Sequence, residues 1–367
     1  METKKHNKRD TMKKYLHILV QTSPYFTDTL IDLINNELNL SKYNTFITHE
    51  KRILDLNTKN NIYYNDNMVD AINEEFENYD YIFVHAMNFT IQELLKINRE
   101  ARKKFIWLTW GHDLYGYSRY KILMLIKQIK LRLKMFLLKD IYGFGFGFEY
   151  DQLQARKLLS KKVKTFHIPY GYIKGSEEVY DKYHEDRNDP NDNLNVLIGH
   201  NGFNFHNHIK IMKKIKKYAG KININLVLSY GGSKKYVEKV KKYAYNNFDI
   251  ENVNIIDRLV NDVDYFKFLY SIDIAIFDYK HSAALGNIYK LLYLGKKLYL
   301  NKNGIIYKGI SEYKDIPIFK TQDIGCSYDD FSKLLTADEK DRCNEYAKWH
   351  ISDKAILKLW KDFFNKN

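Results

Sequence analysis

Residues 196–215 read "VLIGHNGFNFHNHIKIMKKI", and their pattern decides the fold. An apolar run stops at Gly199, a loop of Gly, Asn, His and Phe follows, and a Lys-rich helical pattern then begins. A short buried strand that leads into an amphipathic helix is the repeating unit of parallel α/β sheets. The loop carries more hydrogen-bonding groups than a plain turn needs, so it is also a candidate ligand site.

The same alternation continues on both sides of this stretch. Short β-branched or aromatic runs predict strands at 15–21, 81–86, 104–110, 163–169, 194–199, 222–229, 252–257, 272–278 and 296–301. The run "YGFGFGF", 142–148, does not open a helix as a dinucleotide-binding fingerprint must, so we interpret it as a further strand. Helical patterns lie between the strands.

A polar stretch with few core-forming residues, 174–193, interrupts the alternation and predicts a linker. We therefore predict an α/β protein of two doubly wound domains that face each other across a cleft. The predicted parts are an N-terminal domain over 1–175, a linker over 176–193, a C-terminal domain over 194–337, and C-terminal helices over 338–367 that pack back towards the N-terminal domain.

Composition is typical of a globular cytosolic protein. The 367 residues are 45% hydrophobic and 15% aromatic, which is enough to build two cores. Only Cys326 and Cys343 are present, and they fit neither a disulfide framework nor a zinc site. The apolar run 16–20 is too short for a signal-peptide core, and no run reaches the length of a membrane span.

The net charge indicates an anionic partner. The chain has 59 Lys and Arg against 45 Asp and Glu, a formal charge of +14. Nucleic-acid phosphates, nucleotide phosphates and membrane headgroups are all candidates. The alternative explanation of the positive charge is a genome that encodes Lys at many positions in all of its proteins.

Three loops of the predicted C-terminal domain are candidate ligand sites, because ligands of such sheets bind beyond the carboxyl ends of the strands. Glycines allow close approach of a ligand, amides and hydroxyls bind it, and helix N-termini attract anions such as phosphate groups. A capped polar turn is the alternative interpretation of each loop. The candidate ligand-binding residues are Gly199, Asn201, Gly202, Asn207 and His208; Ser229, Tyr230, Gly231 and Gly232; and Lys280, His281, Ser282, Gly286 and Asn287.

A fourth loop, in the N-terminal half, offers candidates for a general base. The aromatic strand of "WLTWGHDLYGY", 107–117, breaks at Gly111 into His112 and Asp113. Asp113 is our first candidate, followed by His112 and by His85, which ends the strand of "YIFVHA". Asp113 as a helix cap is the alternative.

Five motifs in this order resemble the TDP-N-acetylfucosamine:lipid II N-acetylfucosaminyltransferase family: "WLTWGHDLY", "GHNGFNFHNHI", "LSYGGSKKYVEKV", "DYFKFLYSIDIAIF" and "LGNIYKLLYLGKKLYL". The resemblance covers roughly residues 80–325. It implies a glycosyltransferase of GT-B fold, with two Rossmann-like domains and no cofactor. It further implies inverting, metal-independent transfer of a deoxyamino sugar from a dTDP donor to a lipid-linked saccharide at the cytoplasmic membrane face.

The chain also departs from the family pattern. Trp110, Gly111, Asp113, Leu114 and Tyr115 match its Trp-Gly-x-Asp-Leu-Tyr element, but His200-Asn201 replaces an Asn-Ser pair and residues 281–283 replace an Arg-Gln-Gln. These departures affect the donor, which we therefore expect to be a dTDP- or UDP-sugar. Asp262 and Asp264 could hold a metal ion, but helix capping explains them adequately, and we expect no metal.

Residues 119–139, "RYKILMLIKQIKLRLKMFLLK", predict a helix on an anionic membrane. At helical spacing, Ile122, Leu125, Ile129, Leu133 and Phe136 form one apolar stripe, and Met124, Leu131, Met135 and Leu138 form another. We expect one stripe to pack on the sheet and Met135 and Leu138 to face lipid, with Lys127, Lys130, Arg132 and Lys134 beside them. A helix buried on both faces is the alternative.

The alternatives to a glycosyltransferase are a nucleotide-sugar epimerase of the same fold and a basic nucleic-acid-binding protein. An epimerase has no use for a lipid-facing basic helix. A nucleic-acid binder should show a recognition motif, and the sequence contains none that we recognise. We therefore expect a nucleotide-sugar donor, a lipid-linked acceptor and an anionic membrane surface as partners, and no nucleic acid.

Overall fold

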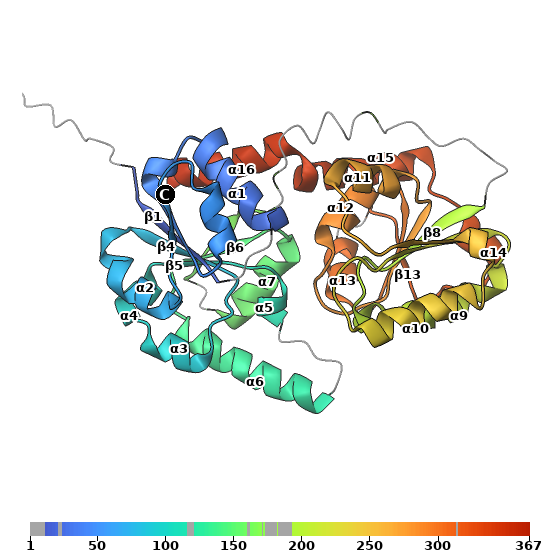
Figure 1. The fold of residues 1–367 in the computed structure, drawn as a ribbon, viewed down its shortest axis with the longest axis horizontal. Coiled ribbons are helices and arrows are strands. Elements are labelled where there is room, and N and C mark those ends of the chain that lie inside the picture. Colours follow the sequence, from blue (N-terminus) through green and yellow to red (C-terminus); the bar gives the residue numbers. More distant parts are fainter. Residues whose placement is uncertain are drawn as a thin grey trace, which may run out of the picture.

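The computed structural model describes residues 12–20, 24–115, 121–159, 162–170, 172, 182, 193–312 and 315–367. These residues form two parallel β-sheets with helices packed around each (Figure 1). The predicted linker, 176–193, lies outside the described residues except for Lys182 and Asn193. Among the described helices, none has both the length and the apolar character that a bilayer span needs.

The first sheet has seven strands in the order β3-β2-β1-β4-β5-β6-β7. The strands are β1 Tyr15–Leu19, β2 Asn44–Thr48, β3 Ile62–Tyr64, β4 Tyr81–His85, β5 Phe105–Leu108, β6 Gly143–Phe146 and β7 Lys164–His167. The α-helices are α1 Thr29–Asp32, α2 Met68–Glu75, α3 Ile91–Lys96, α4 Arg99–Lys103, α5 His112–Tyr115, α6 Lys121–Leu137 and α7 Glu149–Leu158.

The second sheet has six strands in the order β10-β9-β8-β11-β12-β13. The strands are β8 Leu194–Ile198, β9 Ile222–Val227, β10 Val253–Ile256, β11 Ile274–Phe277, β12 Lys297–Leu300 and β13 Ile318–Lys320. The α-helices are α9 His208–Ile215, α10 Lys234–Tyr245, α11 Asp262–Tyr270, α12 Leu285–Tyr293, α13 Ile305–Ser311 and α14 Tyr328–Ser332. The strand order reverses between β8 and β11, which is where doubly wound sheets bind ligands.

Both faces of each sheet are buried, which explains the continuous apolar strand sequences. In β1, Leu16 and Ile18 belong to one hydrophobic cluster, and Tyr15 and Leu19 belong to another. Successive side chains of a strand point to opposite faces, so the two clusters lie on opposite sides of the sheet. A strand covered on both faces reads as an uninterrupted apolar run, and such runs made these strands predictable.

The C-terminal helices connect the two halves, as the sequence predicts. Helix α15, Ala337–Ile351, packs on α12, and α16, Asp353–Lys366, crosses to the first sheet (Figure 1, red). There, Trp360 and Phe363 join the cluster that contains Tyr15. The indole nitrogen of Trp360 also donates a hydrogen bond to the carbonyl of Pro169, at 2.9 Å.

The expected strands are all present, but the sequence analysis did not include β2, β3 and β13. Strands β3 and β13 have three residues each, which is too short for a periodic signal. In β2, "NTFIT", a buried Asn and a buried Thr interrupt the apolar run. The run at 142–148 is a strand, β6, as expected.

Candidate active site

A cavity of about 820 Å³ lies between the two sheets. Its walls come from the segments that follow eight different strands and from the end of α15. The segments after β1, β5, β6 and β7 form one wall, and those after β8, β9, β10 and β11 form the other, with His350 and Ile351 of α15 beside them. The predicted convergence of the loops at the carboxyl ends of the strands is therefore present in the structure.

A buried carboxylate connects the loops of the second sheet. Asp278, which directly follows β11, accepts hydrogen bonds from Asn207 at 3.2 Å, Asn301 at 2.8 Å and Thr321 at 2.6 Å. Lys210 forms an ion pair with it at 2.7 Å. Asp278 therefore links its own loop to the loops after β8, β12 and β13, and neither Asp278 nor Asn207 lines the cavity.

The Gly-Gly pair after β9 allows the loop after β9 to pack closely against the loop after β8. Gly232 has a positive φ of 74°, and a Cβ built there would lie 1.9 Å from the carbonyl oxygen of Gly202. The amide of Gly202 in turn donates to the carbonyl of Tyr230, at 2.8 Å. Only glycine allows the two loops to approach this closely. The neighbouring Ser229 and Tyr230 line the cavity, whereas Gly231 and Gly232 do not.

The loop after β8 presents a neutral imidazole to the cavity. The Nε2 atom of His200 lies 3.0 Å from the amide nitrogen of Asn201, so the ring proton belongs on Nδ1. That Nδ1 is buried and has no partner among the described residues. Burial lowers the pKa of His200 to about 3. His200 is therefore an uncharged imidazole on the cavity wall, with its one N–H group buried.

Asp113 holds its own loop in place. Its carboxylate accepts hydrogen bonds from the amides of Met87 and Trp110, the indole of Trp107 and the hydroxyl of Thr109, at 2.6–3.0 Å. Both oxygens are therefore occupied, and Asp113 does not line the cavity. This geometry suits a residue that anchors the loop rather than a base, and it is not the helix cap of the alternative interpretation, because the bonded donors all precede α5. The side chain of His112 lies outside the described residues.

His85 lies behind the cavity wall. Its Nε2 is 3.0 Å from Nδ1 of His17, whose Nε2 is 2.9 Å from Oδ1 of Asn44. On the other side, Nδ1 of His85 hydrogen-bonds with the hydroxyl of Tyr170, which does line the cavity. Burial lowers the pKa of His85 well below its usual value. Contact between His85 and a ligand would therefore have to pass through Tyr170.

The structure reveals a carboxylate that the sequence analysis missed. Asp151, the third residue of α7, is 2% exposed and lines the cavity. Burial raises the pKa of Asp151 to about 7, although the hydroxyl of Tyr115 donates a hydrogen bond to it. A carboxylate with a pKa near the working pH is suited to general-base catalysis. In the sequence, the position of Asp151 just after the strand run 142–148 could have identified it as a candidate site residue.

Two cations also line the cavity from the second half. Lys290, in the middle of α12, is 4% exposed, and Arg258 follows β10. Burial lowers the pKa of Lys290, and the negative charge of Asp262 opposes that shift. Two cations that face one cavity form a site for an anionic group. The apolar sequence around Lys290 concealed this role.

The predicted donor residues divide into two groups. Those that line the cavity are Asn201, Ser229, Tyr230, Ser282, Gly286 and Asn287. Those that do not are Gly199, Gly202, Asn207, His208, Gly231, Gly232, Lys280 and His281. Ser282 also lies at the junction of the two walls, because a Cβ built on Gly111 would meet its hydroxyl at 3.1 Å.

Helix α6 exposes the opposite stripe from the one we expected. Met135 and Leu138 are 3% and 0% exposed and belong to the core of the first domain. The stripe of Ile122, Leu125, Ile129, Leu133 and Phe136 is exposed instead; we call it the α6 apolar face. The prediction for Met135 and Leu138 is therefore wrong. Both stripes are apolar, so sequence alone could not tell which one packs against the sheet.

Solved structures of similar fold are GT-B glycosyltransferases. Anabaena Alr3699/HepE, crystallised with UDP and glucose, is 13% identical, with a TM-score of 0.65 over 97% of this chain and 100% of that one. A glycosyltransferase from Rickettsia africae is 12% identical, with a TM-score of 0.66 over 97% and 98% of the two chains. A UDP-forming trehalose-phosphate synthase from Burkholderia vietnamiensis is 8% identical, with a TM-score of 0.59 over 97% and 96%.

A family model assigns the chain more narrowly than these structures do. The model of the 4-alpha-L-fucosyltransferases, glycosyl transferase group 56, matches residues 12–328. The match includes both sheets and every loop that lines the cavity. It confirms the resemblance drawn from the five sequence motifs, and it favours a glycosyltransferase over an epimerase. The chain belongs to the 4-alpha-L-fucosyltransferase family of GT-B glycosyltransferases.

Proposed function

We propose that the cavity binds a dTDP- or UDP-sugar and transfers its deoxyamino sugar to a lipid-linked saccharide during cell-surface polysaccharide assembly. The observation that carries the proposal is the arrangement of charges. Lys290 and Arg258 line the wall of the second sheet, and Asp151 lines the wall of the first. A nucleoside diphosphate beside the cations would present its sugar to an acceptor beside the carboxylate. The complex of Alr3699/HepE with UDP-glucose supports a nucleotide-sugar donor.

The proposed reaction is a single displacement that inverts the anomeric carbon. Asp151 removes the proton from the acceptor hydroxyl, whose oxygen attacks the anomeric carbon. The bond from that carbon to the diphosphate oxygen breaks, and the nucleoside diphosphate leaves with the electron pair. Lys290 and Arg258 stabilise the charge that develops on it. No metal ion takes part in the proposed step.

A thermal-shift screen with dTDP, UDP, GDP and CMP tests the proposal. A ligand at 100 times its Kd stabilises the native state by about 2.7 kcal/mol. We expect dTDP or UDP to raise the melting temperature by several degrees and CMP to raise it less. If none of the four shifts the midpoint of the folded protein at millimolar concentration, the proposed donor site is wrong.

We further propose that the enzyme works on the cytoplasmic face of a membrane and that the α6 apolar face contacts the lipid. Figure 1 shows α6 along the lower edge of the first domain. Lys127, Lys130 and Arg132 are exposed on the same helix. A basic pocket of about 250 Å³ adjoins its last turn and is lined by Phe136 and by Arg99, Arg102, Lys103 and Lys139. Apolar side chains beside cations favour an anionic lipid surface.

Vesicle flotation tests this surface. The double substitution Leu133→Asp with Phe136→Asp should lower binding to anionic vesicles at least about tenfold, because each residue contributes roughly 1.5–3 kcal/mol when it is buried in lipid. The control is Ile250→Asp with Leu334→Asp, two exposed apolar residues of the second half. Equal flotation of both variants and the wild type would contradict the assignment.

A further inference from the structure

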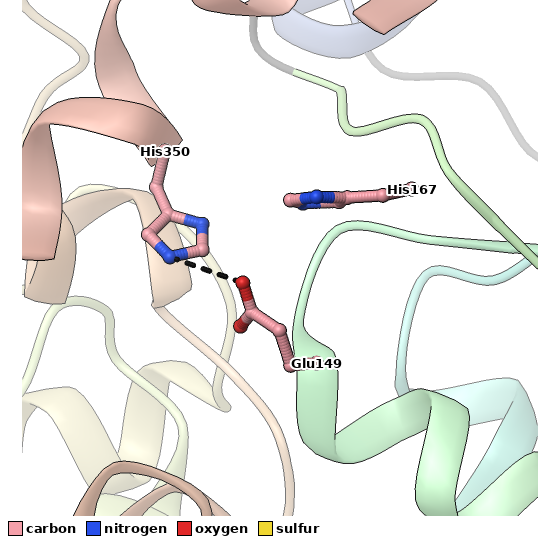
Figure 2. Close-up of side chains that lie close together, drawn as sticks. All are labelled: Glu149, His167 and His350. Carbon is pink, nitrogen blue, oxygen red and sulfur yellow. Dashed lines mark ion pairs between the residues drawn. The ribbon is translucent and has the colours of Figure 1, made fainter. Parts of the chain in front are cut away.

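Three potential metal ligands meet where the two halves of the protein join. Glu149 is the first residue of α7, His167 is the last residue of β7, and His350 is the penultimate residue of α15. One side-chain nitrogen or oxygen atom of each lies within 4.8 Å of the others. Figure 2 shows the three side chains converging from separate segments of the chain. Two segments belong to the first domain, and the third belongs to the helix that packs on the second.

Each of the three residues has a buried atom without a partner. Among the described residues, Glu149 Oε2, His167 Nε2 and His350 Nδ1 have no hydrogen-bond partner. A polar contact within the cluster joins Nε2 of His350 to Oε1 of Glu149, at 3.4 Å (Figure 2). Buried polar atoms are nearly always paired, so three unpaired ones on neighbouring side chains indicate a missing ligand.

Aromatic neighbours fix the orientation of the two imidazoles. His350 stacks on Tyr289 with 3.9 Å between ring centroids, and His167 stacks on Phe146 at 5.2 Å. Rings held in place in this way lose little conformational freedom when an ion binds.

We propose that Glu149, His167 and His350 bind a divalent transition metal ion, with Zn²⁺ as the best fit. Two imidazoles and one carboxylate are a common zinc ligand set, with a fourth position left for water. Nitrogen ligands favour Zn²⁺ over Mg²⁺ or Ca²⁺. With bonds of about 2.0–2.1 Å, tetrahedral ligand atoms lie roughly 3.4 Å apart. Small side-chain rotations would therefore close the site.

The position of the cluster indicates a structural role for the metal. Glu149 and His167 do not line the donor cavity, whereas His350 lies on its wall, and the ion would join the first two to the C-terminal end of α15. The ion would thus fix the turn between α15 and α16 against the first domain and limit how far the two halves can separate. This inference goes beyond the proposed function and does not depend on it.

Cobalt titration of the full chain tests the site. After removal of metals with EDTA, the wild type should bind about one equivalent of Co²⁺, with the visible absorption of a four-coordinate nitrogen and oxygen site. Zn²⁺ should displace the Co²⁺ and raise the melting temperature. His350→Phe, which keeps a ring against Tyr289, and Glu149→Gln should each weaken binding at least tenfold. His49→Ala, which changes an exposed histidine, should bind Co²⁺ like the wild type.

Two results would overturn the site. One is a wild type that takes up no stoichiometric Co²⁺; the other is uptake that survives both substitutions, which would move the ion to other histidines. Circular dichroism of the metal-free variants identifies any that do not fold. If one of His350→Phe and Glu149→Gln does not fold, Co²⁺ binding by the other decides whether the site is correct. Glu149→Gln should keep the melting shift caused by dTDP or UDP, so failure of the metal site and failure of the donor site can be told apart.

Discussion

Replacing Asp151 with Asn should lower kcat by about 10²–10⁴, the usual contribution of a general base. The amide keeps the size of the side chain and can accept the hydrogen bond from Tyr115, but it cannot take up the acceptor proton. Steady-state assays with a dTDP- or UDP-sugar and a lipid-linked acceptor measure the loss. Donor binding should change little, because Asp151 and the cations lie on opposite walls.

The pH dependence should identify the same residue. The pKa of Asp151 is raised to about 7, so the wild-type kcat/KM should fall as the pH decreases through that value. A carboxyl group whose pKa is raised on folding stabilises the protein at low pH, and this contribution is lost as the pH rises towards 7. Asp151→Asn should therefore melt at the same temperature as the wild type or higher at pH 8. An active variant with an unchanged pH profile would remove Asp151 from the role of base.

The matched comparison is Asp113→Asn. Its carboxylate accepts four hydrogen bonds, so an amide in its place brings an NH₂ group against one or more of their donors. We expect a lower melting temperature for this variant, with a smaller effect on kcat per folded molecule than Asp151→Asn. The reverse order of effects would restore Asp113 as the base.

Replacing Lys290 with Met should weaken the binding of dTDP or UDP by roughly 30-fold or more. Removal of one member of a buried charge pair costs about 2–5 kcal/mol, and each 1.4 kcal/mol is a factor of ten. Methionine fills most of the same volume in α12, so packing should survive. Isothermal titration measures the loss, which should be large for the diphosphates and small for the free nucleosides.

Lys267→Met is the control for this experiment, because Lys267 is exposed on α11 and does not line the cavity. It should bind the diphosphates like the wild type. If Lys290→Met folds and binds them with unchanged affinity, the diphosphate does not lie beside Lys290.

The fold was largely predictable because each sheet is built from strands buried on both faces. Their apolar runs separate clearly from the amphipathic helices, and the rule that ligands bind beyond the strand ends located the cavity. The same rule would have found Asp151 if it had been applied to the strand run 142–148. The loop after that run was not among the four candidate loops.

Other features depend on tertiary packing and could not be read from sequence. A Gly-Gly pair suits a phosphate site and a contact between loops equally well, and only the structure shows that Gly232 approaches Gly202. Lys290 lies in an apolar helix, where sequence does not show whether a lysine points outwards or into a cavity. The cluster of Glu149, His167 and His350 spans about 200 residues of sequence, so no local spacing could reveal it.

Helix α16 determines when the first domain can complete its folding. Trp360, Phe363 and Phe364 cover the sheet face that includes Tyr15 in the first strand. During synthesis, this face emerges from the ribosome long before its cover is translated. The first domain therefore cannot complete this face of its core until α16 has been synthesised.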